Sequence, residues 1–299
     1  MDNLSNLVKI YLFVCDAYEK ELKHSVQRFS NNNQPRFTDQ EIMTIMLYCT
    51  GYERRLTVKG VYDFTSRWLR SWFPLLPSYT AFVIRVNKLS EAFRGLFAIM
   101  LRDHAPHFHS EYFSMVDSMP VITCSGKRSG KVAREVTDKG YCSTKSLYYY
   151  GVKLHFLTCR VAGRLPFPES FIITPASEND LNVFRDNWSG IGGKVVFADK
   201  AYIDSQMQQQ MSCNGSHLLT PVKHPRKTAE RLKQISKAAD DLFSRAVSSI
   251  RQPLEALFAW LLEKSDIQRA SKVRSTNGLF VHIFAKLAAM FFIKLKTNS

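Results

Sequence analysis

Residues 113–120 read FSMVDSMP and residues 195–202 read VVFADKAY, and the two stretches share one pattern. In each, a short apolar run that is typical of a buried strand leads directly into an aspartate. These aspartates are Asp117 and Asp199. An aspartate at a strand end can project from the edge of a sheet, where a cation can reach it. Such a residue is more often a turn or cap residue, so the pattern alone leaves both roles open.

The region after about residue 110 predicts a mixed α/β domain. Helices are expected at residues 179–188 and 203–211, and the chain after Ala229 has a helical pattern again. Runs of β-branched and aromatic residues predict strands at residues 112–116, 147–157, 171–174, 195–198 and 218–222.

The first third of the chain is predicted to be helical. Thr38 is followed three residues later by Glu41, which is the pattern of a capping box at a helix start. We therefore expect a helical domain over residues 1–105 and a second domain over residues 106–299 with a basic helical end. The helix after Thr38 and the one from Val58 could form a helix-turn-helix-like pair that reads DNA ends. A role in dimerisation, or a purely structural role, fits this region equally well.

A third acidic residue stands out by its context. Glu255 lies in residues 251–258, RQPLEALF, beside an apolar stripe at helical spacing. The stripe consists of Leu254, Leu257, Phe258 and Leu261. Glu255 could therefore lie at the border between a core and a cleft.

Three carboxylates that meet in one cleft could hold two hard cations such as Mg²⁺, which prefer oxygen ligands. Two such ions can activate an attacking oxygen and stabilise a leaving one on phosphorus. Spacing in the sequence does not show that Asp117, Asp199 and Glu255 converge.

The charge of the chain indicates a polyanionic partner. Lys and Arg number 41 against 26 Asp and Glu, which gives a net charge of +15, and residues 221–299 hold the largest share of the excess. Two clusters are candidates for phosphate contacts, although a solvated surface explains the second equally well. The first includes Lys127, Arg128 and Lys131, in a glycine- and serine-containing loop, and the second includes Lys223, Arg226 and Lys227.

The six cysteines are scattered without CxxC spacing, so a zinc or redox site has little support. The N-terminus lacks the pattern of a signal peptide. The most apolar stretch, residues 279–293, is 15 residues long and is interrupted by His282 and Lys286. It is too short and too polar to span a bilayer, and we expect a buried helix there. A cytoplasmic protein is the expectation.

Several motifs resemble those of bacterial insertion-sequence transposases. Residues 197–202, FADKAY, look like their Asp-Lys-Gly/Ala-Tyr signature, and residues 116–118, VDS, look like their first-strand aspartate motif. Residues 149–155, YYGVKLH, resemble their second strand, and Arg251 with Glu255 resembles the Arg-x-x-x-Glu of their catalytic helix. The whole chain is similar to the family of insertion sequence 982.

This resemblance implies an RNase H-like α/β fold, a mixed sheet flanked by helices, behind the helical N-terminal domain. It implies an Asp-Asp-Glu site of Asp117, Asp199 and Glu255 that binds two Mg²⁺ or Mn²⁺ ions. The implied activity is DNA strand cleavage and transfer at terminal inverted repeats, with target DNA as the second substrate and a dimer on DNA. Lys200, Arg251 and Lys264 join the two basic clusters as expected DNA contacts.

The chain departs from the family pattern Tyr-x-x-Arg-x-x-x-Glu-x-x-x-x-x-x-Lys at two positions. Ser248 stands in the tyrosine position and Leu262 in the lysine position, with Lys264 two residues later. Pro253 leaves two alternatives, because a helix that begins there would exclude Arg251 from the helical face of Glu255. Two rival functions also remain open: an RNase H-like nuclease without strand transfer, and a catalytically inactive DNA-binding relative.

Overall fold

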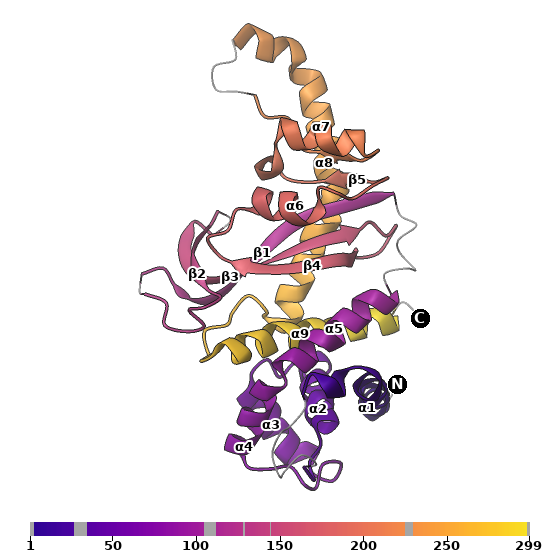
Figure 1. The fold of residues 1–299 in the computed structure, drawn as a ribbon, viewed down its shortest axis with the longest axis vertical. Coiled ribbons are helices and arrows are strands. Elements are labelled where there is room, and N and C mark those ends of the chain that lie inside the picture. The colour runs from indigo at the N-terminus through magenta and orange to yellow at the C-terminus, as the bar shows by residue number, and fades with distance from the viewer. Residues whose placement is uncertain are drawn as a thin grey trace. The chain divides into compact units, whose positions relative to one another are not determined.

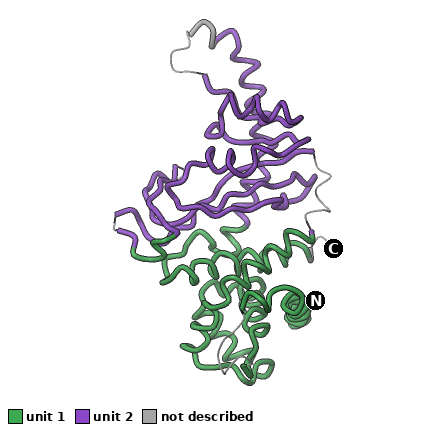
Figure 2. Tube along the Cα trace, in the orientation of Figure 1, with its two compact units in different colours: residues 1–103, 131–135, 261–299 green, residues 104–130, 136–260 purple. Residues whose placement is uncertain are grey.

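The computed structural model describes residues 3–26, 35–104, 112–127, 129–143, 145–224 and 230–297. The chain forms two compact units (Figure 2). Unit 1 contains residues 1–103, 131–135 and 261–299, and unit 2 contains residues 104–130 and 136–260. The boundary after residue 103 lies close to the expected one at 105. Residues 261–299, which we assigned to the second domain, pack instead with the N-terminal helices.

Unit 1 is helical. Its helices are α1 (Asn3–Lys20), η1 (Leu22–His24), α2 (Asp39–Gly51), α3 (Val58–Trp68), α4 (Tyr79–Lys88), α5 (Ser90–His104, to residue 103) and α9 (Thr276–Thr297). The expected capping box is confirmed at the start of α2, where the Glu41 N–H donates to Thr38 Oγ1 at 3.2 Å and the Thr38 N–H donates back to the Glu41 carboxylate. Helix α2 packs on α1 and α9, so both ends of the chain build this core.

The apolar helix α9 is longer than the sequence suggested. Residues 276–295 form a stretch of 20 residues with mean hydropathy 1.8, enough by length and composition to cross a membrane. Our expectation that it is too short was therefore wrong. Of its most apolar window, however, 72% is buried, and Phe291 packs on Phe97 with ring centroids 5.7 Å apart. The expected buried helix is confirmed.

Unit 2 contains a six-stranded mixed sheet in the order β2-β3-β1-β5-β6, with β4 also paired to β3 (Figure 1). Strand β1 is antiparallel to β3 and parallel to β5, which is in turn parallel to β6. The strands are β1 (Phe113–Ser125), β2 (Asp138–Cys142), β3 (Leu147–Cys159), β4 (Phe167–Pro175), β5 (Val195–Phe197) and β6 (His217–Leu219).

Strand β1 runs far beyond the predicted residue 116, through Pro120. Its partner β5 pairs only with Phe113–Met115, so one side of β1 is open beyond that point. A proline that lacks an N–H is tolerated on such an open side. The short polar strand β2 had no sequence signal and was not predicted.

Helices cover both faces of the sheet (Figure 1). They are α6 (Asp180–Trp188), α7 (Ser205–Cys213) and α8 (Glu230–Ser265), of which residues up to 260 belong to unit 2. Leu157 packs in a cluster with Phe184 of α6 and Met207 of α7. Its neighbour Phe156 points to the other face and packs on Phe258 of α8 at 5.5 Å. This mixed sheet between helices confirms the predicted α/β class and is consistent with an RNase H-like fold.

Candidate catalytic site

Asp117 and Asp199 follow neighbouring positions of two paired strands. Met115 of β1 is paired with Phe197 of the parallel strand β5, and each aspartate follows two residues later. Val116 and Ala198, which precede the aspartates, both point into the core on the α6 face. Because side chains alternate along a strand, Asp117 points to the opposite face, where Arg251 of α8 bonds it. Asp199 lies two residues beyond the end of β5 and is near enough to raise the pKa of Asp117.

Helix α8 brings Arg251 and Glu255 to Asp117. The Arg251 guanidinium donates from Nη1 to Asp117 Oδ2 at 2.6 Å and from Nη2 to Glu255 Oε1 at 2.7 Å. Pro253 lies inside α8 rather than at its start, so Arg251 and Glu255 are one turn apart on the same helical face. The alternative in which Pro253 begins the helix is therefore excluded.

The buried stripe of α8 positions these polar residues. Leu254, Leu257 and Leu261 are fully buried, as the sequence predicted. Glu255 lies beside the stripe with 57% of its side chain exposed, whereas Arg251 is 14% and Asp117 23% exposed. Glu255 is therefore at the border between core and solvent, and Asp117 is the most enclosed of the carboxylates.

The environment of Asp117 disfavours its charged form. Burial raises the pKa of the Asp117 carboxyl to about 6, although Arg251 and the Ser118 N–H act in the opposite direction. The nearby carboxylates of Asp199 and Asp180 raise this pKa further. A cation beside these carboxylates would offset both the burial and the repulsion.

The donor set has the chemistry that a hard divalent cation needs, since every candidate ligand is a carboxylate oxygen. In the described parts of the chain, however, no three His, Cys, Asp or Glu side chains are grouped closely enough to hold a metal ion. The guanidinium of Arg251 separates Asp117 from Glu255 and supplies the positive charge there. Asp117, Asp199 and Glu255 therefore offer the right ligand type, but they are not grouped as a metal site in this arrangement.

No motif in the sequence indicated Asp180, which lies on the opposite face of the sheet and bonds residues of β1 and β3. Ser118 Oγ donates to Asp180 Oδ2 at 3.1 Å, and Lys153 Nζ donates to Asp180 Oδ1 at 2.9 Å. Lys153 lies in the strand motif YYGVKLH, and this motif was the one feature of the sequence that could have pointed to the group around Asp180. The Asp180 group fixes Ser118, the residue whose N–H donates to Asp117.

The expected DNA contacts are only partly brought together. Lys127, Lys200 and Lys223 of unit 2 are exposed, and Lys200 directly follows Asp199. Lys131 and Lys264 belong to unit 1, where Lys264 pairs with Glu263. Arg128, Arg226 and Lys227 lie outside the described residues. Arg251 is engaged by two carboxylates.

A comparison with protein families decides how this site is interpreted. The profile of the transposase DDE domain matches residues 109–292, which include Asp117, Asp199 and Glu255. The chain belongs to the DDE transposase family. No curated protein matches the chain. The matched transposase domain covers the whole sheet of unit 2 and extends into α9.

Proposed function

We propose that this chain is an insertion-sequence transposase that cuts and joins DNA strands at the ends of its element. The observations that support this most are that Asp117 and Asp199 each come two residues after the paired positions Met115 and Phe197, and that Arg251 of α8 bonds both Asp117 and Glu255. We also propose that it is a member of the family of insertion sequence 982, on the motifs quoted above.

Asp117, Asp199 and Glu255 would hold two Mg²⁺ or Mn²⁺ ions. When bound, such ions supply activation of the attacking oxygen and charge stabilisation on phosphorus. Water attacks the phosphorus and the bond from phosphorus to the 3′-oxygen breaks. A proton of the water leaves to solvent, and the departing 3′-oxygen takes up a proton to become a free 3′-OH. This 3′-OH then attacks a phosphodiester of the target DNA and expels another 3′-oxygen. None of the three carboxylates needs to become a covalent intermediate.

Arg251 has two roles in this proposal. In its present position it neutralises Asp117 and Glu255 and keeps the buried carboxylate paired. After release, its planar fork can bind two oxygens of a phosphate. Arg251 would thus exchange a carboxylate for the DNA backbone.

DNA at the terminal inverted repeats and the target would be bound by the basic residues that the sequence singles out. The proposed contacts are Lys127, Arg128, Lys131, Lys200, Lys223, Arg226, Lys227 and Lys264, with Arg251. Two element ends must meet for transfer, so we propose that the active species is a dimer on DNA. The site of action would be the bacterial cytoplasm, at the nucleoid.

Single substitutions test this function. Asp117→Ala, Asp199→Ala and Glu255→Ala should each abolish Mn²⁺-dependent cleavage of an element end while the protein still folds and binds the same DNA. Full activity in one variant would remove that residue from the site. Asp186→Ala, which alters an aspartate of α6 outside the site, is the matched control and should keep the wild-type cleavage.

The closed pairing of Arg251 with Asp117 specifically favours one alternative, a DNA-binding relative that has lost catalysis. A strand-transfer assay with pre-cleaved ends separates the alternatives. Joining supports the transposase, cleavage without joining supports a nuclease, and DNA binding without either supports the inactive relative.

A further inference from the structure

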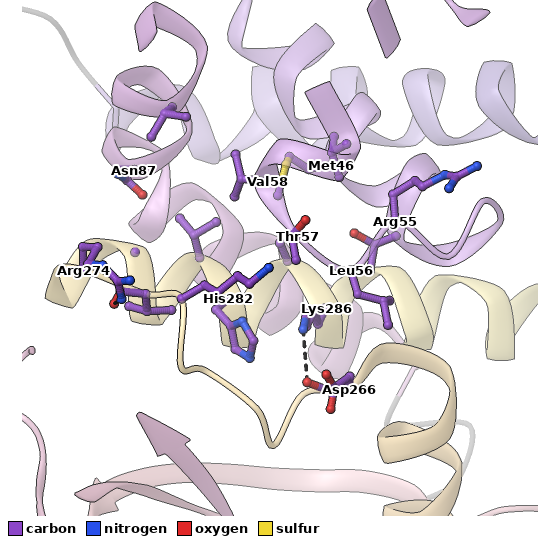
Figure 3. A pocket seen from close by; sticks show the side chains of 18 of the residues that line it. Met46, Arg55, Leu56, Thr57, Val58, Asn87, Asp266, Arg274, His282 and Lys286 are labelled. Atoms are coloured by element: carbon purple, nitrogen blue, oxygen red, sulfur yellow. Dashed lines mark hydrogen bonds between the residues drawn. The ribbon is translucent and has the colours of Figure 1, made fainter. Parts of the chain in front are cut away.

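Unit 1 contains a cavity that the proposed chemistry does not use. Its volume is about 440 Å³, and it is lined by α2, α3 and α4 together with the segment between α8 and α9 and with α9 itself (Figure 3). This volume is within the range of small-molecule sites. The interior is mostly apolar, with walls from Met46, Val58, Val61, Val83, Val281 and Ala285.

Basic side chains line the same cavity. Arg55, Arg269, Lys272 and Arg274 are exposed, and within the described residues none of them forms an ion pair. Arg274 is held in place by its bonds to the Ser271 and Val273 carbonyls. The one carboxylate in the lining belongs to Asp266. The excess of positive charge favours an anionic ligand.

Two helix N-termini add to this field. Thr57 caps α3, and Ser275 accepts a hydrogen bond from the Gly278 N–H at the start of α9. Thr57, Ser275 and Gly278 all line the cavity. The helix dipole favours a phosphate at such ends.

The α9 side of the cavity is fixed by two buried contacts. Figure 3 shows Lys286 directed at Asp266, whose carbonyl oxygen it contacts at 3.2 Å. One turn earlier, His282 Nε2 bonds the Ile267 carbonyl oxygen at 2.8 Å. These contacts tie the segment after α8 to α9, so that the basic residues that follow are carried on a fixed wall.

We propose that this cavity binds a nucleotide, with its phosphate at the basic residues and its base against the apolar walls. Asn87, which forms no hydrogen bond with another described residue, lines the cavity with an amide that can both donate to and accept from a base edge. The nucleotide comes either from solution or from an unpaired end of a DNA strand. The inference goes beyond the proposed function and does not depend on catalysis at Asp117.

The test is calorimetric binding to the full chain in the presence of a chelator, so that no DNA is cut. The ligands are deoxyadenosine monophosphate, deoxyadenosine, inorganic phosphate, and DNA duplexes with either blunt ends or one unpaired nucleotide. If the nucleotide comes from solution, deoxyadenosine monophosphate should bind at least tenfold more tightly than deoxyadenosine. If it comes from a DNA end, the duplex with one unpaired nucleotide should bind at least tenfold more tightly than the blunt duplex. Which of the two binds more tightly identifies the source.

Two variants test the contributions of the phosphate contacts and of the base contacts to binding separately. Arg274→Gln should weaken binding roughly tenfold, since a charged hydrogen bond is lost. Val83→Phe should weaken it similarly by filling the cavity without a change in charge. Arg94→Gln, an exposed arginine of α5 that does not line the cavity, is the matched control and should have no effect.

Thermal melts check that each variant folds. Equal binding of inorganic phosphate and monophosphate, with no effect of Val83→Phe, would overturn the proposal in favour of a surface anion site. Absence of binding by both the mononucleotide and the unpaired DNA end would also overturn it, whatever the cleavage assays show.

Discussion

Arg251 of α8 donates a 2.6 Å hydrogen bond to Asp117 of β1, a residue 134 positions earlier in the chain. The same guanidinium bonds Glu255, so one cation joins two of the three carboxylates that the sequence singles out. This bridge connects α8 to β1, the first strand in chain order.

The bridge predicts a strong coupling between Arg251 and Asp117. Arg251→Gln leaves a largely enclosed carboxylate without its partner and should destabilise the protein by about 2 kcal/mol, below the loss for a fully buried pair. Asp117→Asn in the same background should recover much of this loss, because the uncompensated charge is gone. Urea unfolding of the wild type, the two single variants and the double variant, without divalent ions, measures the coupling free energy of the pair. Additive losses would show that the pair is not coupled.

Divalent ions should stabilise the chain through the same carboxylates. A ligand that binds only the folded state raises its stability, by about 2.7 kcal/mol at a hundredfold excess over its dissociation constant. Thermal melts with Mn²⁺ and with chelator should therefore differ for the wild type and coincide for Asp199→Asn. Asp186→Asn, which alters an aspartate of α6 outside the site, is the control and should keep the wild-type shift. An equal shift in Asp199→Asn would contradict the metal assignment.

Stability should depend on pH through His282. Burial, assisted by Lys286, lowers the pKa of His282 to about 3 in the folded protein, from about 6.5. The unfolded chain therefore binds a proton more readily between pH 3 and 6.5, so the His282 contribution is complete above pH 6.5 and is lost as the pH falls toward 3.

His282→Gln removes this titration and retains a side chain that can donate to the Ile267 carbonyl. In urea unfolding from pH 3 to 6.5, the slope of the unfolding free energy should be shallower in the variant, by at most about 1.4 kcal/mol per pH unit. Parallel curves would show that His282 does not titrate in this way.

Gly151 should be essential for the sheet. A Cβ at this position would lie 1.9 Å from the Val121 carbonyl oxygen, which is backbone of the paired strand β1. Gly151→Ala should therefore force β1 and β3 apart and destabilise the protein by roughly 3 kcal/mol or more. Gly190→Ala is the matched control, because its Cβ meets no atom within 4 Å and its effect should stay below about 1 kcal/mol. Equal stability of the two variants by thermal unfolding would refute this account.

Local sequence patterns were sufficient for much of the fold. Thr38 and Glu41 interact within one helical turn, so their capping box could be read directly, and the apolar stripe around Glu255 predicted the buried face of α8. The runs before Asp117 and Asp199 likewise predicted strands β1 and β5. These features depend on neighbours a few residues away.

Only the tertiary structure showed which segments that are distant in the sequence pack against one another. Pro253 can either begin or continue a helix, and only the packing of Leu254 and Leu257 in a continuous α8 kept Arg251 in line with Glu255. Asp180 of α6 has no motif of its own, and its partners Ser118 and Lys153 come from the distant strands β1 and β3. Residues 261–299 join the N-terminal helices because burial of an apolar helix depends on the surface available, which no local pattern specifies.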